Sequence, residues 1–209
     1  MDAAALTEIR TPAVAVAGVL DRLRASSEPL ECVIVGAGVQ GRAHARTVED
    51  VLRGVREVSV TFVSRHEPAD LAYPWAQLGS DAADEALGKA GLVVLATSAG
   101  EPVVVDRQLR PDATVLAVGA HTVDTRELHE DVLRGAQVIV EDVEAARREA
   151  GDVAIAVEKG ALAWDDVATM AEVVRGEVAL DPARRVVLKT VGMPWEDLAV
   201  ARVVAEAAL

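Results

Sequence analysis

The sequence predicts an α/β fold in which a mostly parallel, doubly wound sheet is flanked by N- and C-terminal helices. Short valine-rich runs alternate with segments of helical periodicity, as expected for strands that are buried on both faces. Hydrophobic residues make up 51% of the 209 residues and aromatic residues only 2%. This composition favours alanine-rich helices packed on a valine-rich sheet. A glycine-rich turn also separates the first strand from the helix that follows it.

The first expected element is a helix. Thr11 and Pro12 have the character of an N-cap and a first helical residue, and apolar residues at helical spacing continue to about Ala25. Residues 26–29 then form a linker of serine, glutamate and proline. We therefore interpret residues 1–29 as an N-terminal helical segment.

Strands and helices are expected to alternate from residue 30 onward. Asp124 and Glu127 have the spacing of a capping box, which predicts a helix to about Leu133. After about Glu141 the chain is expected to be mainly helical, with a last helix opened by Pro194. The expected strands are residues 31–35, 58–63, 92–96, 114–118, 137–140 and 186–188, and the other expected helices are residues 39–53 and 81–87.

The sequence GAGVQG at residues 36–41 has G-x-G-x-x-G spacing directly between a buried strand and a helix. Gly36 permits a tight turn, Gly38 lets a diphosphate approach the backbone, and Gly41 lets the helix pack close to the sheet. The free N–H groups that begin the helix, at Val39 and Gln40, would face the phosphates. The motif predicts a dinucleotide site of the Rossmann type; the alternative is a plain strand-to-helix turn.

The residues after the second strand favour a phosphorylated dinucleotide. Proteins that bind NAD usually have an acidic residue there, which grips the ribose hydroxyls. This chain has Ser64 and Arg65, and its first acidic residue is Glu67. Arg65 can pair with a 2′-phosphate and Ser64 can donate a hydrogen bond to it. We therefore expect NADPH (NADP) rather than NAD, the alternative being a solvated arginine at a strand end.

Two later strands end in small or polar residues. Thr97 and Ser98 follow one strand, and Val118 and Gly119 end another. In a doubly wound sheet such strand ends line the ligand crevice, and small residues leave room for the nicotinamide and its ribose. We therefore expect residues 30–145 to form an NAD(P)-binding Rossmann domain, followed by a C-terminal helical segment with a returning strand over residues 146–209.

Charge and composition exclude several classes of partner. The formal net charge is −13, so the surface repels nucleic-acid phosphates and anionic lipid. One cysteine excludes an internal disulfide framework, and the four histidines have no metal-ligand spacing. No apolar stretch is long enough to cross a membrane. Asp2 and Glu8 stand where a signal peptide would be basic, so a cytoplasmic location is expected.

Seven sequence motifs occur in a fixed order and together resemble the ornithine cyclodeaminase/mu-crystallin family, from about Leu6 to the C-terminus. They are RT at residues 10–11, GAGVQG at 36–41 with His44 beyond it, LATSAGEPVV at 95–104, AVGAHTVDTREL at 117–128, EAGD at 149–152, WDDV at 164–167 and LKTVGMPWEDLAVA at 188–201. Members of that family pair a Rossmann domain with a second domain that carries substrate residues and the dimer interface.

The resemblance implies a protein that binds NAD(P)(H) and acts on a small α-amino or α-imino acid. Arg10 matches the arginine that holds the substrate carboxylate, and it precedes the expected helix, where an anion is favoured. Thr97, Val191 and Gly192 match positions that contact the cofactor. The leading hypothesis is an NADPH-dependent reductase of a cyclic or α-imino acid such as 1-pyrroline-2-carboxylate. The alternatives are a non-catalytic NADPH-binding protein like mu-crystallin, one subunit of a two-chain enzyme, and an ornithine cyclodeaminase.

Two departures from the family pattern affect these expectations. His121 stands where cyclodeaminases have an aspartate; it can donate a proton near neutral pH but cannot anchor a substrate ammonium. This disfavours ornithine cyclodeamination and favours imine reduction, the alternative being a polar side chain that fills the crevice. The family's long first segment, which supplies a further arginine and a lysine, should also have ended before residue 1. Residues 1–29 would then be a remnant of the substrate domain. Three explanations are open: the protein is a truncated form, its substrate site is rebuilt, or a partner chain in a homodimer or complex supplies the missing segment.

Overall fold

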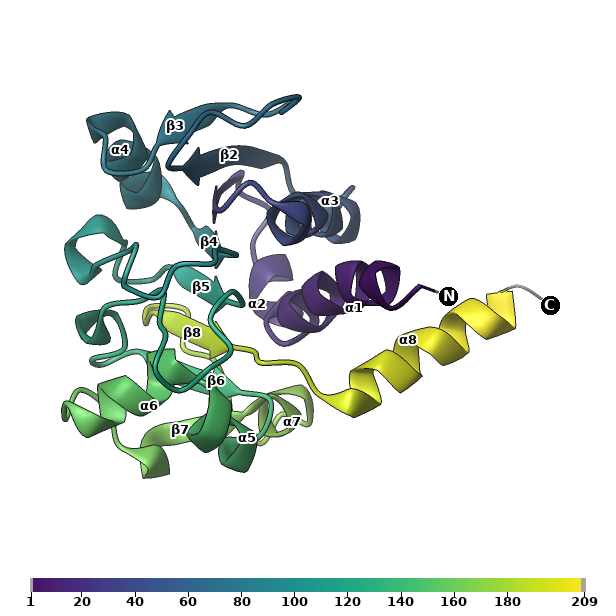
Figure 1. The fold of residues 1–209 in the computed structure, drawn as a ribbon, viewed down its shortest axis with the longest axis vertical. Helices are drawn as coiled ribbons and strands as arrows, with labels where there is room; N and C mark the ends of the chain where they lie inside the picture. Colours follow the sequence, from purple (N-terminus) through teal and green to yellow (C-terminus); the bar gives the residue numbers. More distant parts are fainter. Residues whose placement is uncertain (1, 208–209) are drawn as a thin grey trace.

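Eight strands form one parallel sheet in the computed structural model, which describes residues 2–207 (Figure 1). The strand order is β3-β2-β1-β4-β5-β8-β6-β7, and each of these pairs is parallel. The predicted doubly wound parallel sheet is confirmed. The strands are β1 (Leu30–Val35), β2 (Val58–Ser64), β3 (Trp75–Gln77), β4 (Leu92–Leu95), β5 (Thr114–Ala117), β6 (Gln137–Val140), β7 (Val167–Thr169) and β8 (Val186–Lys189).

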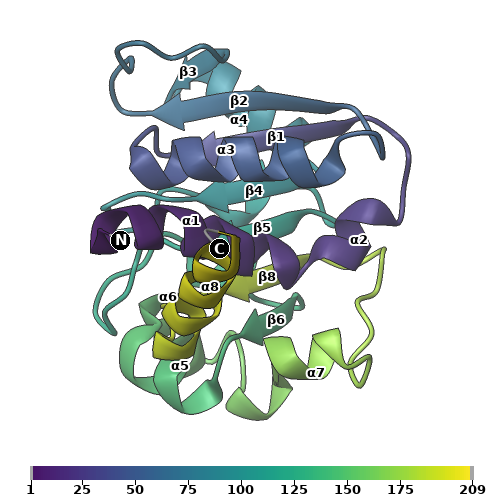
Figure 2. The same ribbon diagram turned by 90° about the vertical axis from the view of Figure 1, so that its right-hand side faces the viewer.

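Helices cover both faces of this sheet (Figures 1 and 2). Alternate residues of each strand enter opposite cores: Val33 and Val35 pack on the side of α4 and α6, whereas Cys32 and Ile34 pack on the side of α1 and α3. This is the period-2 arrangement expected of a strand buried on both faces. The α-helices are α1 (Ala3–Ala17), α2 (Leu20–Arg24), α3 (Val39–Leu52), α4 (Asp81–Lys89), α5 (Val143–Glu149), α6 (Gly151–Glu158), α7 (Met170–Val174) and α8 (Pro194–Ala207).

The order of the strands creates a crevice beside β1. The chain runs from β1 outward to β2 and β3, and then returns to place β4 on the other side of β1. The connections that leave β1 and β4 therefore diverge at their carboxyl ends, which is where doubly wound sheets bind ligands. β8 enters between β5 and β6, so it brings the residues after Lys189 to the same edge.

Helix α8 extends away from the body of the molecule beside α1 (Figure 1). Trp195, Leu198 and Val203 are exposed on it. Among the described residues, no helix combines the length and the apolar character that a membrane crossing requires.

The first helix begins earlier than predicted. It starts at Ala3, and the side chain of Asp2 caps it by accepting a hydrogen bond from the Ala4 amide. Pro12 lies inside the helix instead of at its first position. The prediction that Arg10 precedes a helix N-terminus is therefore wrong, because Arg10 lies within α1.

The predicted helix from Asp124 to Leu133 is also wrong. This segment contains only a short 3-10 helix, Glu130–Val132. The Glu127 carboxylate does not cap a helix, because tertiary hydrogen bonds draw it into the interior. Two edge strands were not predicted: β3, in the stretch expected to be irregular, and β7, in the segment expected to be mainly helical. Each has three residues, too few for a clear apolar pattern.

Candidate functional site

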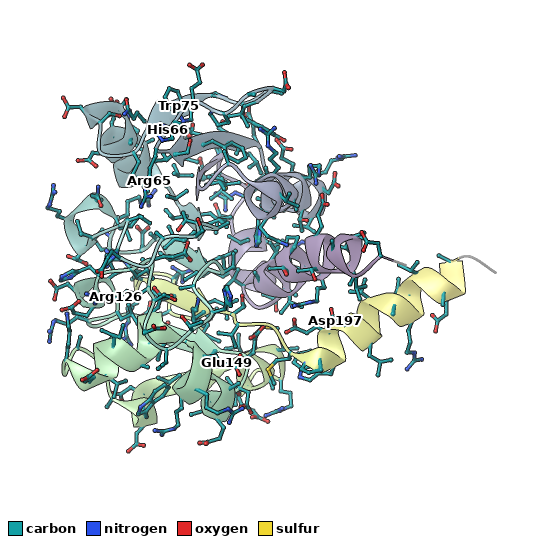
Figure 3. All side chains as sticks on the ribbon, viewed as in Figure 1. Arg65, His66, Trp75, Arg126, Glu149 and Asp197 are labelled. Atoms are coloured by element: carbon teal, nitrogen blue, oxygen red, sulfur yellow. The ribbon has the colours of Figure 1, made fainter. Side chains whose placement is uncertain are left out.

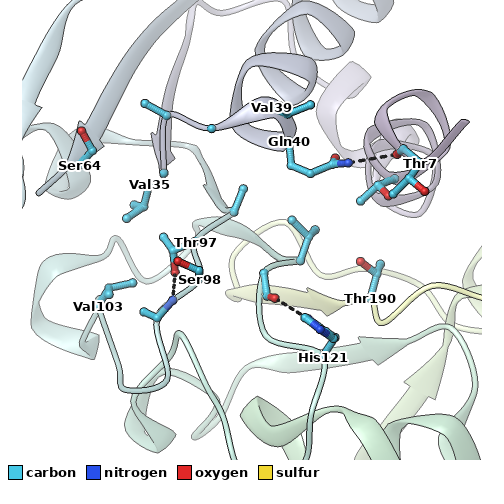
Figure 4. Close-up of a pocket in the computed structure, with 18 of the residues that line it drawn as sticks. Thr7, Val35, Val39, Gln40, Ser64, Thr97, Ser98, Val103, His121 and Thr190 are labelled. Carbon is cyan, nitrogen blue, oxygen red and sulfur yellow. Dashed lines mark hydrogen bonds between the residues drawn. The ribbon is translucent and has the colours of Figure 1, made fainter. Parts of the chain in front are cut away.

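A cavity of about 860 Å³ opens at the carboxyl ends of the central strands (Figure 4). It is built by segments far apart in the sequence: α1, the glycine turn, and the residues that follow β2, β4, β5, β6 and β8. The cavity brings together nearly all the residues predicted to form the site. Those that line it are Arg10, Gly36, Gly38, Val39, Gln40, Ser64, Arg65, Thr97, Ser98, Val118, Gly119, His121, Val191 and Gly192.

Gly41 does not line the cavity but shapes the turn from behind. A Cβ built on Gly41 would lie 1.9 Å from the Gly36 carbonyl oxygen, so no other residue fits there. Gly36 has φ +106°, a conformation that favours glycine. Together these two glycines let the chain reverse from β1 into α3 with the backbone in close contact.

The start of α3 fits a diphosphate group. Gly38 is its N-cap and provides no side-chain cap, and a Cβ built there would meet nothing within 4 Å. The first N–H groups of a helix have no partner within the helix and carry its positive dipole end. The backbone at Val39 and Gln40 therefore faces the cavity with donors and open space (Figure 4), which suits an anionic ligand.

Arg42 fixes the loop after β2 against the glycine turn. Its guanidinium donates to the carbonyls of Ala37 (3.1 Å), Ala69 (2.9 Å) and Asp70 (3.0 Å). The sequence analysis did not identify this role, because nothing in the spacing of Arg42 shows that its partners are carbonyls of a distant loop.

At the end of β2, Ser64 and Arg65 differ in whether their side chains are available to bind a ligand. The Ser64 hydroxyl donates to the His66 carbonyl (2.7 Å) and accepts from Trp75 Nε1 (2.8 Å). Arg65 lines the cavity, and within residues 2–207 no carboxylate forms an ion pair with it. Arg65, His66 and Trp75 lie together at the β2–β3 end of the sheet (Figure 3). Arg65 is thus the side chain at this end that can pair with an anion.

Glu127 joins two strand ends at the cavity. Its buried carboxylate accepts hydrogen bonds from the Thr97 amide and hydroxyl (both 2.7 Å) and from the amides of Gly119 (2.7 Å) and Ala120 (3.3 Å). Burial is the main cause that raises the pKa of Glu127. The polar donors of Thr97 are therefore engaged by Glu127, and Thr97 forms a fixed wall of the cavity.

A second buried pair supports Glu127 from behind. Asp152 Oδ1 accepts from the amides of Glu127 and Leu128, at 2.8 Å each. Lys189 Nζ lies 3.2 Å from Asp152 Oδ2 and donates to the Ala120 carbonyl. The sequence analysis missed Glu127, Asp152 and Lys189 as site residues. All three fall within motifs of the family resemblance, and a charged residue at the end of an apolar strand, as at Lys189, was the available signal.

Arg10 is held by α8. Its Nη1 donates to Glu196 Oε2 (2.8 Å) and its Nε lies 2.7 Å from Asp197 Oδ1. The guanidinium packs on Gly192, where a built Cβ would come within 2.7 Å of Nη1. Arg10 thus reaches the cavity as predicted, but with two carboxylates already bound to it.

Glu141 and Glu196 form a buried carboxyl pair beside Arg10. Glu141 accepts from the amides of Val191 (2.8 Å) and Gly192 (3.0 Å). Burial, and then a hydrogen bond with Glu196, raise the pKa of Glu141 to about 7. Glu196 Oε1 is buried and has no other donor within the described part of the chain. A proton on Glu141 would let this carboxyl group donate a hydrogen bond to that oxygen.

His121 lines the cavity beyond the end of β5. Its ring Nδ1 is 3.1 Å from the Gly119 carbonyl oxygen (Figure 4), and the side chain is exposed. It therefore follows the Glu127-bound loop directly, on the side of the cavity that also contains Thr190. No group of three or more His, Cys, Asp or Glu side chains in the described residues is arranged to hold a metal ion.

Comparison with known proteins agrees with this geometry. The whole chain, residues 1–209, matches the ornithine cyclodeaminase/mu-crystallin family. Delta(1)-pyrroline-2-carboxylate reductase 2 of Burkholderia ambifaria is 30% identical over 99% of this chain and 65% of its own length. The ketimine reductase mu-crystallin of Mus musculus is 32% identical over 98% of this chain and 63% of its own length.

Solved structures show the same fold. Thermococcus litoralis Delta(1)-pyrroline-2-carboxylate reductase, determined in complex with NADH and L-proline, superposes with a TM-score of 0.79 and 27% identity over 97% of this chain and 65% of its own. The chain thus spans 63 to 65% of the length of these relatives. On the match along its full length, this chain belongs to the ornithine cyclodeaminase/mu-crystallin family.

Proposed function

We propose that this chain carries the cofactor site of an NADPH-dependent reductase that acts on a small cyclic or α-imino acid. The observation that carries the proposal is the single cavity that combines the uncapped glycine turn at Gly38 with Arg65 at one end and Arg10 at the other. Relatives named as reductases of pyrroline-2-carboxylate and ketimines support the substrate class. A similar structure in complex with NADH and L-proline supports the cofactor class.

Different residues of this chain would bind different parts of the cofactor. The turn from Gly36 to Gly38, with the N–H groups of Val39 and Gln40, would hold the diphosphate. Arg65 would pair with the 2′-phosphate, which is the basis for NADPH over NADH. The small residues at the ends of β4, β5 and β8 would surround the nicotinamide. When bound, the reduced dinucleotide supplies hydride to the imine carbon.

Arg10 and His121 would act on the substrate. Glu196 and Asp197 orient the Arg10 guanidinium, and its Nη2 remains available to bind the substrate carboxylate. His121, exposed at the open side of the cavity, would supply the proton to the imine nitrogen. Holding both partners in one cavity would contribute most of the rate.

The test is the loss of NADPH absorbance when 1-pyrroline-2-carboxylate is added to the purified chain. We expect oxidation of NADPH, and we expect Arg10→Ala to lower kcat/KM by about 10-fold to 100-fold because a charge-assisted carboxylate contact is lost. Arg53→Ala is the matched control, since Arg53 is exposed at the end of α3, outside the cavity lining, and pairs with Asp50. Tight NADPH binding without oxidation would contradict the reductase assignment for this chain.

A second candidate is an NADPH-binding protein without turnover. One observation favours it: Arg10 already pairs with the carboxylates of Glu196 and Asp197, so a substrate carboxylate must compete with both. A two-chain enzyme would give the same result with the isolated chain, but turnover would return when a co-purifying partner is added.

A further inference from the structure

We propose that Glu127 is a positioning residue that shapes the nicotinamide end of the cavity and leaves the adenine end unaffected. The proposal rests on the proposed function, since it concerns the same cofactor cavity. One buried carboxylate would thus control how tightly the cavity binds the nicotinamide half of the dinucleotide.

Glu127 joins the loops that follow two neighbouring strands, β4 and β5. One oxygen accepts from the Thr97 amide and hydroxyl, after β4, and the other accepts from the Gly119 and Ala120 amides, after β5. Hydrogen bonds to an ionised acceptor are about twice as strong as neutral ones. Removing the carboxylate would leave buried amides without partners.

The two loops close tightly around this carboxylate. A Cβ on Gly119 would lie 2.2 Å from the Thr97 carbonyl oxygen and 2.5 Å from Glu127 Oε1. The two loops are therefore in close contact with each other and with the Glu127 carboxylate. A change at Glu127 must alter the separation of Thr97 and Gly119, and both of these line the cavity.

Glu127 is itself held in place by a buried pair of charged side chains. Asp152 accepts from its amide, and Lys189 pairs with Asp152 and donates to the Ala120 carbonyl. Lys189 is the last residue of β8 and directly precedes Thr190, which lines the cavity. The ends of β4, β5 and β8 are therefore connected through one buried network of charged groups.

The adenine end has none of these contacts. Ser64 ends β2 and Arg65 follows it, and β2 lies on the other side of β1 from β4. Figure 4 shows Ser64 at one side of the pocket and His121 at the opposite side, with Thr97 and Ser98 between them. A disturbance at Glu127 should therefore reach the nicotinamide end and not the phosphate site at Arg65.

The experiment compares two ligands on the full chain by calorimetric titration: NADPH, and 2′,5′-ADP, which carries only the adenine half and the 2′-phosphate. Glu127→Gln keeps the shape, but its amide cannot accept hydrogen bonds on both sides. We expect the Kd for NADPH to rise about 10-fold or more while the Kd for 2′,5′-ADP changes less than about 2-fold. Glu130→Gln is the matched control, because Glu130 pairs with Arg126 and Lys159 outside the cavity, and it should change neither Kd.

Equal weakening of both ligands by Glu127→Gln, or an unchanged Kd for NADPH, would overturn the proposal. If the unmodified chain binds neither ligand, the proposed function fails instead. If Glu127→Gln does not fold, Thr97→Val decides, because it removes one donor to Glu127 and keeps the side-chain volume. We expect this variant to weaken NADPH about 3-fold with 2′,5′-ADP unchanged; no effect on NADPH, or an equal effect on both ligands, would overturn the proposal.

Discussion

Arg65 is the residue on which the proposed preference for a phosphorylated dinucleotide depends. It lines the cavity at the end of β2, where an acidic residue would favour NADH. We expect Arg65→Ala to raise the Kd for NADPH about 10-fold to 100-fold and to leave the Kd for NADH nearly unchanged, because only NADPH has the 2′-phosphate. Fluorescence titration with both cofactors measures this, and equal weakening of the two would contradict the assignment.

Glu141 should make the stability of the protein depend on pH. Its folded pKa, about 7, lies above the ordinary value of 4.5, so its contribution to the free energy of unfolding is complete below about pH 4.5 and is lost as the pH rises through 7. Glu141→Gln keeps a donor toward Glu196 at every pH. We therefore expect the two proteins to have similar Tm values at pH 5, and the variant to melt a few degrees higher at pH 8.

His44 changes the stability with pH in the opposite direction to Glu141, so its effect must be controlled for. Burial lowers its pKa to about 4, and its contribution to stability is present above about pH 6.5 and lost as the pH falls toward 4. Because His44 is the same in both proteins, the difference between their Tm values isolates Glu141. A difference that does not change between pH 5 and 8 would contradict the raised pKa of Glu141.

At the scale of elements, two glycines at the start of α3 are expected to have different roles: Gly41 in folding, and Gly38 in ligand binding. A Cβ at Gly41 would collide with the Gly36 carbonyl oxygen, whereas a Cβ at Gly38 meets only open space. We expect Gly41→Ala to lower the Tm markedly, and Gly38→Ala to keep the Tm within about 2 °C while it weakens NADPH at least 10-fold, since the new methyl group occupies the approach of the diphosphate. Thermal unfolding and titration of both variants check this, and unchanged NADPH binding by Gly38→Ala would contradict it.

The elements that could be predicted from the sequence are those whose signal is local. The central strands are short apolar runs, and the glycine spacing fixes the turn before α3. The prediction of a helix from Asp124 to Leu133 is wrong because the Glu127 carboxylate accepts four tertiary hydrogen bonds. These stabilise it more than a local helix cap would. The roles of Arg42 and Glu141 could not be predicted for the same reason: their contacts exist only in the folded sheet, and their spacing in the sequence gives no sign of them.

At the scale of the whole molecule, the sheet topology is what makes one site out of distant segments. Arg10 and Gly192 are in contact although they lie near opposite ends of the chain, because β8 returns into the middle of the sheet. The candidate site therefore depends on the complete order β1-β4-β5-β8. The sequence could predict that the residues at these strand ends line a site, but only the folded structure shows that they meet in one cavity.

Calorimetric titration of the folded chain with NADPH, and separately with NADH, measures most directly whether the glycine turn and Arg65 form a dinucleotide site. We predict saturable binding of one NADPH per chain, at least about 10-fold tighter than NADH. A chain with a normal thermal unfolding transition that binds neither dinucleotide would contradict the account.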